Sequence, residues 1–190
     1  MTAVIVVCTG NVCRSPIAEG LVRRATEHRA GGARVTVSSA GTAGWEGSPA
    51  MPEAVEVAAE RGVDISGHVA TRLRPGMASA ADLVLCMAGE HRDLIAREEP
   101  PAAGRTFTLK ELVRLLEDGG HAEATPAARI AAAARDREAG TVRPDEDVAD
   151  PLGLPLDGYR AIAAELDDWI ARLVPALWDP IPAALGSGDT

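Results

Sequence analysis

Short apolar runs alternate with amphipathic stretches over the first two thirds of the chain. The runs at residues 3–7, 35–37, 83–87 and 105–109 are dominated by apolar and β-branched residues, and they have the length of strands. Each run is followed, directly or after a loop, by a stretch in which apolar residues recur at helical spacing. Because strands that alternate with helices are joined by right-handed crossovers, this pattern predicts an α/β fold. We expect a single three-layer domain in which a four-stranded, parallel, doubly wound sheet carries helices on both faces.

The helix after the first strand has a clear predicted start, since Ser15 is a favourable N-cap and Pro16 a favourable first helical residue. The second strand is expected to be short and to pass into a loop that carries Trp45. Three further helices are expected, one at about 52–61 and the others around residues 91–95 and 112–116.

The alternation stops after the fourth helix. A stretch rich in Ala and Arg, with Thr125 and Pro126 at its start, predicts a helix that runs to about Ala139 and ends at Gly140. This helix has few large apolar residues to bury. We therefore interpret residues 119–146 as an inserted helical segment that is mostly solvated.

A strongly amphipathic helix is predicted after the insertion, and we expect it to cover one face of the sheet. Its apolar residues recur at intervals of three and four: Tyr159, Ile162, Leu166, Trp169, Ile170 and Leu173. Pro175 is expected to end or kink this helix. The domain is thus expected to span residues 1–180, with residues 181–190 as a flexible tail.

Composition and charge restrict the ligands that this chain can bind. The 190 residues are 46% hydrophobic and 25% charged, which excludes an intrinsically disordered chain. The formal net charge of −9 argues against nucleic acid and anionic membranes as partners, because both need concentrated positive charge. Three cysteines are too few for a disulfide framework and the N-terminus lacks a secretory signal, so we expect a cytoplasmic protein. No cluster of Cys, His and acidic residues has the spacing of a metal site, and neither a metal nor a cofactor is expected.

The candidate chemistry lies between the first strand and the first helix, in the run Cys8-Thr9-Gly10-Asn11-Val12-Cys13-Arg14-Ser15. Backbone N–H groups at such a junction lack helical partners, and they can converge on an anion. Cys8 begins the loop and Arg14 ends it, so a bound oxyanion would meet both a thiol and a guanidinium. Helix N-termini and neighbouring arginines lower cysteine pKa values, so we expect Cys8 to react as a thiolate. The alternative, that Cys8 is only a small buried core residue, fits the strand-loop-helix context less well.

Residues 7–19 resemble the signature of the low-molecular-weight protein tyrosine phosphatases, whose fold is a four-stranded parallel sheet with flanking helices. Other stretches resemble that family in the same order along the chain: 38–42, 62–68, 82–87 and Asp150-Pro151. The resemblance covers most of residues 3–178, apart from about 119–146. It implies a cysteine-dependent hydrolase that forms a phosphocysteine intermediate. Its substrate would be phosphotyrosine in a protein, or a related small phosphomonoester.

The resemblance also assigns the catalytic roles. Cys8 would be the nucleophile, Arg14 would bind and orient the phosphate, and Asp150 would act first as general acid and then as general base. The order of the motifs and the following proline favour Asp150 over the other nearby acidic residues, Asp145, Glu146, Asp147 and Asp157.

Further site residues follow from the same resemblance. The phosphate would be bound by the loop residues Thr9, Gly10, Asn11, Val12, Cys13 and Ser15. Ser15 would also hydrogen-bond the thiolate, and Trp45 would form a wall of the cleft. Ser39 and His68 would support the loop through Asn11, and Cys13 would protect Cys8 by forming a reversible disulfide. Purely structural roles for His68 and Cys13 are the alternatives.

One departure from the family bears on the substrate. Leu152-Gly153-Leu154 follow the predicted acid, where better-known members carry aromatic residues, so the cleft would have one aromatic wall and could prefer another phosphomonoester. An arsenate reductase on the same fold is the alternative enzyme. That reaction needs resolving cysteines after the third strand, whereas Cys86 lies inside the strand. A phosphate-binding module without catalysis is the alternative outside the enzymes.

Overall fold

The structure is a computed structural model that describes residues 2–27, 34–43, 45–119, 123, 125–137 and 143–179. Its strands are β1 (Thr2–Cys8), β2 (Val35–Gly41), β3 (Leu83–Cys86) and β4 (Thr106–Thr108). They form one parallel sheet in the order β2-β1-β3-β4, so the predicted α/β fold with a four-stranded parallel sheet is confirmed. Because β1 lies between β2 and β3, the strand order reverses at β1. Sheets of this kind bind ligands at the carboxyl ends of the strands beside such a reversal.

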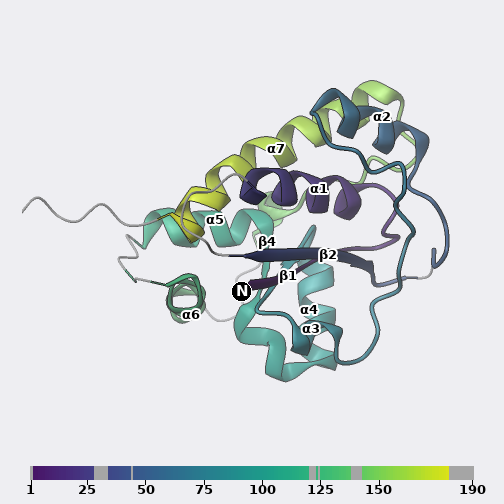
Figure 1. Cartoon of the computed structure of the whole chain (residues 1–190). Coiled ribbons are helices and arrows are strands. Elements are labelled where there is room, and N and C mark those ends of the chain that lie inside the picture. The colour runs from purple at the N-terminus through teal and green to yellow at the C-terminus, as the bar shows by residue number, and fades with distance from the viewer. Residues whose placement is uncertain are drawn as a thin grey trace, which may run out of the picture.

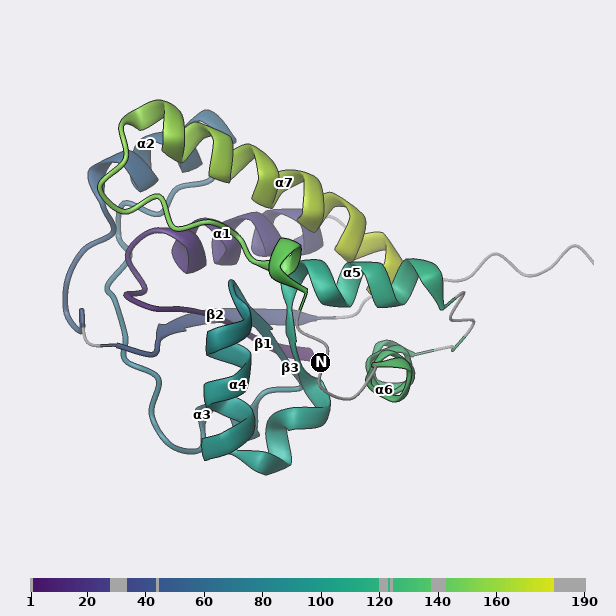
Figure 2. The ribbon, with the colours of Figure 1, turned by 180° about the vertical axis from the view of Figure 1, so that it is seen from behind.

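Helices cover both faces of the sheet (Figure 1). One side carries α1 (Arg14–Glu27), α2 (Pro52–Glu60), α5 (Leu109–Asp118) and α7 (Leu156–Trp178). The other side carries α3 (Met77–Ala80) and α4 (Gly89–Glu98), followed by the 3-10 helix η1 (Pro100–Arg105), as the view from behind also shows (Figure 2).

The strand β1 separates two hydrophobic cores. Val4 and Val6 pack with the helices of the first side, whereas Ile5 and Val7 pack with those of the second. Successive side chains of a strand point to opposite faces, so a strand buried on both faces must be apolar at every position. The uninterrupted apolar run that predicted this strand is therefore explained by its central place in the sheet.

Two predicted element boundaries near the carboxyl ends of the strands were wrong. The strand β2 does not stop at Val37 but continues to Gly41, because residues 38–41 pair in register with residues 5–8 of β1. The helix α1 begins at Arg14, so Ser15 lies inside the helix and is not its N-cap. The Ser15 hydroxyl instead contacts the Cys8 sulfur and the Asn11 side chain.

Of the two effects predicted for Pro175, it does not end the last helix, since α7 continues to Trp178. A proline removes one helical N–H donor, which costs stability. The residues around it, Leu173, Val174 and Leu177, are buried in the main core, where α7 contacts its neighbouring helices, and this packing holds the final turn.

The inserted segment contains the predicted helix, α6 (Pro126–Asp136), but this helix is not mostly solvated. Ile130 and Ala133 are buried in the main core. The Arg129 side chain is only 4% exposed, and it donates hydrogen bonds to the carbonyl oxygens of Ala176 and Asp179 at the end of α7. The predicted end of the helix near Ala139 and Gly140 lies outside the described residues.

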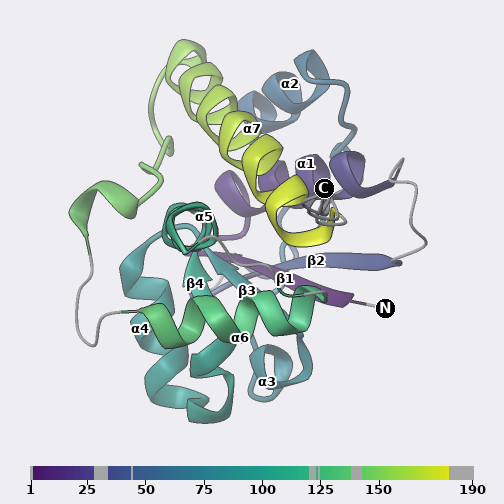
Figure 3. The ribbon, with the colours of Figure 1, turned by 90° about the vertical axis from the view of Figure 1, so that its left-hand side faces the viewer.

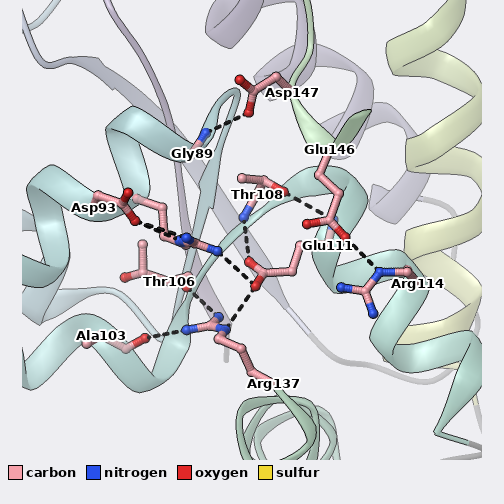
Figure 4. A network of polar contacts seen from close by, with 11 residues as sticks. Gly89, Asp93, Ala103, Thr106, Thr108, Glu111, Arg114, Arg137, Glu146 and Asp147 are labelled. Carbon is pink, nitrogen blue, oxygen red and sulfur yellow. Dashed lines mark hydrogen bonds and ion pairs between the residues drawn. The ribbon is translucent and has the colours of Figure 1, made fainter. Parts of the chain in front are cut away.

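The insertion also covers the open edge of the sheet at β4. Arg137 donates hydrogen bonds to the carbonyl oxygens of Thr106 and Ala103, and it forms an ion pair with the buried Glu111. Figures 1 and 3 show α6 beside α5, at the end of the molecule opposite to the loop between β1 and α1. Figure 4 shows the Arg137 contacts. The insertion therefore stabilises the edge of the sheet, because an edge strand otherwise presents unpaired backbone groups.

The predicted flexible tail, residues 181–190, lies outside the described residues, and the predicted domain limits stay a prediction. Within the described ranges, no helix combines the length and the apolar character needed to cross a membrane.

Candidate active site

The predicted phosphate loop connects the carboxyl end of β1 to the start of α1, at the reversal of the strand order. A small cavity of about 50 Å³ opens at this loop. It is lined by Cys8, Thr9, Gly10, Val12, Cys13, Arg14, Trp45, Asp150 and Leu152. The fold thus brings the predicted nucleophile, cation and acid to one cavity, although Asp150 is 142 positions from Cys8 in the sequence.

The Cys8 sulfur is surrounded by hydrogen-bond donors. The backbone N–H of Asn11 donates to Sγ at 3.2 Å, and the Ser15 hydroxyl lies 2.9 Å from it. Asn11 Nδ2 donates to the Ser15 oxygen, which leaves the Ser15 hydroxyl hydrogen free to point at the sulfur. Donors in these positions stabilise a negative charge on sulfur, as a nucleophile or leaving group requires.

Asn11 holds the loop in an unusual backbone conformation. Within the described ranges, Asn11 is the only residue other than glycine with a positive φ, which is 57°. Its side chain is fully buried. Its Nδ2 donates to the hydroxyls of Ser15 and Ser39 at 2.8 Å each, and its Oδ1 accepts from the Thr71 N–H at 2.8 Å. His68 Nε2 donates to the Asn11 carbonyl oxygen at 2.8 Å. The structure therefore brings Ser39 and His68 to Asn11, where the loop-support prediction requires them.

One supporting residue was not found from the sequence. Glu19 Oε2 accepts a hydrogen bond of 2.6 Å from the Ser39 hydroxyl, so the polar chain runs from Cys8 through Ser15, Asn11 and Ser39 to this carboxylate. Glu19 lies one turn of α1 beyond Ser15, on the same helix face, and this spacing was the available signal.

Arg14 connects the loop to the segment that carries Asp150. Its side chain is only 6% exposed, and Nη2 donates to Asp150 Oδ2 at 2.6 Å and to Thr9 Oγ1 at 3.4 Å. Nη1 donates to the Val148 carbonyl oxygen at 3.1 Å. The Asp150 carboxylate is 46% exposed, so it lies at the mouth of the cavity, where a leaving group would emerge.

The backbone before Asp150 is fixed to α4 and α5. Asp147 Oδ1 accepts from the Gly89 N–H at the start of α4, and Glu146 accepts from Arg114 Nε, as Figure 4 shows. Lys110 donates to the carbonyl oxygen of Asp147 at 2.7 Å. The Glu146 and Asp147 carboxylates therefore anchor the segment. Of the other two alternatives to Asp150 as the general acid, Asp157 pairs with Arg160. Neither Asp157 nor Asp145 lines the cavity.

The cavity has two apolar side chains at its rim. Trp45 is 43% exposed, and its indole lies over Gly10, where an added Cβ would come within 3.0 Å of the ring. Leu152 also lines the cavity and is exposed. Trp45 therefore lies where the cleft-wall prediction placed it, and an aliphatic residue accompanies it.

His91 is a second residue that sequence reasoning missed. Its Nε2 lies 2.9 Å from Thr9 Oγ1, so it orients the hydroxyl that accepts from Arg14. Burial, and then the positive charge of Arg14, lower the pKa of His91 to about 4, so the ring is neutral near pH 7. His91 follows the carboxyl end of β3, the same edge of the sheet as Cys8, and this position was the signal.

The other two cysteines have different surroundings. The Cys13 sulfur lies 3.5 Å from the Tyr159 hydroxyl, and burial raises the pKa of Cys13 to about 11. Cys86 is fully buried within β3, and burial raises its pKa as well. Protection of Cys8 by Cys13 stays a prediction, and Cys13 would take part as a thiol near neutral pH. Within the described ranges, no three His, Cys, Asp or Glu residues are grouped as metal ligands.

Comparisons with known proteins point to one family. A family model described as low molecular weight phosphotyrosine protein phosphatase matches residues 3–124. The low molecular weight protein-tyrosine-phosphatase Etp of Escherichia coli is 42% identical over 105 residues, which are 55% of this chain and 67% of that protein. A protein-arginine-phosphatase of Geobacillus stearothermophilus is 34% identical over 174 residues, which are 92% of this chain and 95% of that protein. The crystal structure of a low molecular weight protein tyrosine phosphatase from T. tengcongensis has a TM-score of 0.72 at 36% identity, and the match covers 93% of this chain and 100% of that one.

Proposed function

Because this chain belongs to the low molecular weight phosphotyrosine protein phosphatase family, we propose that it dephosphorylates proteins through Cys8, Arg14 and Asp150. The observation that supports these roles is the convergence of a thiol, a buried guanidinium and a carboxylate on one cavity. Relatives named as tyrosine and as arginine phosphatases support a protein phosphatase function.

The first step transfers the phosphoryl group to sulfur. The substrate phosphate replaces Asp150 as the partner of Arg14, and the freed carboxylate takes up a proton from solvent and faces the leaving atom as a carboxylic acid. The Cys8 thiolate attacks phosphorus while the bond to the leaving oxygen breaks, and Asp150 donates a proton to that oxygen. Arg14 and the loop N–H groups stabilise the charge on the phosphoryl oxygens.

The second step releases phosphate. Asp150, now a carboxylate, accepts a proton from water as the water attacks phosphorus, and the phosphorus–sulfur bond breaks. The Ser15 hydroxyl donates a hydrogen bond to the sulfur, and this bond stabilises the departing thiolate. Inorganic phosphate leaves and both catalytic groups return to their starting states, so the cycle consumes only water.

The substrate that we favour is a phosphotyrosine side chain in a protein. Trp45 and Leu152 provide apolar walls beside the phosphate loop, and an aromatic ring would bury its faces against them. The apolar rim offers little to a small, fully polar phosphomonoester. An arsenate-reducing relay has little support, since Cys86 is fully buried within β3.

Phosphoarginine in a protein is the second candidate substrate. The relatives named protein-arginine-phosphatase align with 92% of this chain, as fully as the tyrosine phosphatase structure from T. tengcongensis, which covers 93% of it. The same nucleophile and cation would act on a phosphorus–nitrogen bond, with Asp150 protonating the leaving nitrogen.

A paired assay tests these proposals. Phosphate release is measured from p-nitrophenyl phosphate and from one peptide sequence carrying either phosphotyrosine or phosphoarginine. We expect Cys8→Ser and Arg14→Ala to abolish turnover, and Asp150→Asn to lower kcat for the phosphotyrosine peptide by about 10²- to 10⁴-fold. Full activity of Cys8→Ser would overturn the mechanism. A higher kcat/KM for phosphoarginine than for phosphotyrosine would overturn the favoured substrate and leave the mechanism standing.

A further inference from the structure

The segment that carries Arg72 is fixed directly beside the catalytic loop. Thr71 donates its N–H to the Asn11 side chain, and its carbonyl oxygen accepts from the Gly41 N–H at 2.8 Å. Leu73 then donates to the Gly41 carbonyl oxygen at 2.7 Å, so Arg72 pairs with Gly41 in a parallel bridge next to the end of β2. Gly41 pairs in turn with Cys8. The backbone of Arg72 is therefore two strand positions from the nucleophile.

The side chain of Arg72 has no partner among the described residues. It is exposed, and within the described part of the chain it makes neither an ion pair nor a hydrogen bond. Its neighbour Arg74 differs, because it forms an ion pair with Glu46 on the loop that also carries Trp45. An unpaired guanidinium on a rigid backbone is available to a ligand.

Arg72 lines a second cavity that adjoins the catalytic loop. This cavity, of about 320 Å³, lies between the segment 72–75 and α4. Thr42 is also one of its lining residues, and the Thr42 N–H donates to the Cys8 carbonyl oxygen at 2.9 Å. Thr42 therefore links the lining of the second cavity to the backbone of Cys8.

The acidic groups of this second cavity do not neutralise Arg72. Glu99 accepts hydrogen bonds from the N–H groups of Gly76 and Ser79 at the start of α3, and Glu98 faces Arg97. Arg72 thus offers a positive charge to the cavity, in a protein whose net charge is −9. A substrate with negative charge around its phosphorylated residue is repelled by the molecule as a whole, and this local cation offsets the repulsion.

We propose that Arg72 selects protein substrates by pairing with an acidic side chain that lies one or two positions from the phosphorylated residue. This proposal rests on the proposed protein phosphatase function and adds the charge of the flanking sequence to it. An aspartate or glutamate of the substrate would pass over Thr42 and meet the guanidinium of Arg72 at the rim of the second cavity.

The test uses three phosphotyrosine peptides that differ only in the residues flanking the tyrosine, which are Glu, Gln or Lys. For the wild-type chain we expect kcat/KM to be two- to fivefold higher for the Glu peptide than for the Gln peptide, the range of an exposed ion pair, and to fall with added salt. Arg72→Ala should remove this preference, and Arg72→Glu should reverse it in favour of the Lys peptide. Arg34→Ala is the matched control, because Arg34 is also exposed and has no partner in the described ranges, but it precedes β2 at the opposite end of the strand.

Turnover of p-nitrophenyl phosphate separates this proposal from the phosphatase function. The small substrate has no flanking residues, so Arg72→Ala should hydrolyse it at the wild-type rate. An unchanged Glu to Gln ratio in Arg72→Ala, with p-nitrophenyl phosphate turnover intact, would overturn the role of Arg72 and leave the phosphatase function standing. Absence of turnover in the wild-type chain would instead overturn the phosphatase function itself.

Discussion

Replacing Asn11 by alanine tests whether this side chain holds the catalytic loop in shape. Alanine removes the hydrogen bonds to Ser15, Ser39 and the Thr71 N–H, all in a buried place. It also leaves a residue with a β-carbon at a φ of 57°, a region that asparagine tolerates better than alanine.

The expected loss follows from these contacts. Each buried hydrogen bond contributes about 0.5–1.5 kcal/mol, and the left-handed backbone costs alanine about 1 kcal/mol. We therefore expect the free energy of unfolding to fall by about 2.5–5.5 kcal/mol, against a total of about 5–15 kcal/mol for an ordinary domain. The kcat should fall as well, because Ser15 and the loop N–H groups lose their fixed orientation toward the Cys8 sulfur.

Urea unfolding followed by circular dichroism measures the stability, and p-nitrophenyl phosphate turnover measures the activity. Asn11→Gly loses the same hydrogen bonds but accepts a positive φ, so we expect it to be about 1 kcal/mol more stable than Asn11→Ala. A loss below about 1 kcal/mol in Asn11→Ala, or an unchanged kcat, would refute the view that Asn11 holds the loop.

Three further results are expected. Gly41→Ala should lose most of its activity, because the new methyl group would lie 2.7 Å from the Thr9 carbonyl oxygen and push the catalytic loop away. As the pH is lowered from about 6.5 to about 4, the wild-type chain should lose stability relative to His91→Gln, by on the order of 3 kcal/mol at most. Urea unfolding at each pH measures this loss. The sign follows because the unfolded chain binds a proton on His91 near pH 6.5, whereas the folded chain binds it only near pH 4. Arg137→Ala should lower the free energy of unfolding by about 2–3 kcal/mol and leave p-nitrophenyl phosphate turnover unchanged, because Arg137 covers the β4 edge far from the loop.

Matched variants make these results decisive. Gly67→Ala adds a methyl group that meets nothing within 4 Å, so equal losses in Gly67→Ala and Gly41→Ala would contradict the steric argument. Parallel pH curves for the wild-type chain and His91→Gln would show that the folded chain does not hold this ring neutral. Arg135 is mostly exposed, and a stability loss in Arg135→Ala as large as that in Arg137→Ala would count against a special role for the edge contacts.

Local patterns in the sequence were sufficient for the architecture and for the centre of the site. The apolar run of β1 and the loop from Cys8 to Arg14 are continuous in the chain, and the preferences of a buried strand and an anion-binding loop act within a few residues. The family resemblance also named Asn11, Ser39 and His68, and the structure brings all three together.

Contacts between distant segments decided the rest. Whether Ser15 caps a helix or faces a sulfur depends on where Asn11 points, and the length of β2 depends on its register with β1. The burial of α6 depends on Arg129 and Arg137 meeting carbonyl groups of α7 and β4, which no pattern within the insertion reveals. The sequence by itself was enough to propose the nucleophile and the phosphate-binding loop, because reactive groups and loop geometry are local properties. Only the tertiary structure decided which of several nearby carboxylates faces Arg14 and that Arg74, not Arg72, pairs with Glu46, because charges pair across space and not along the chain.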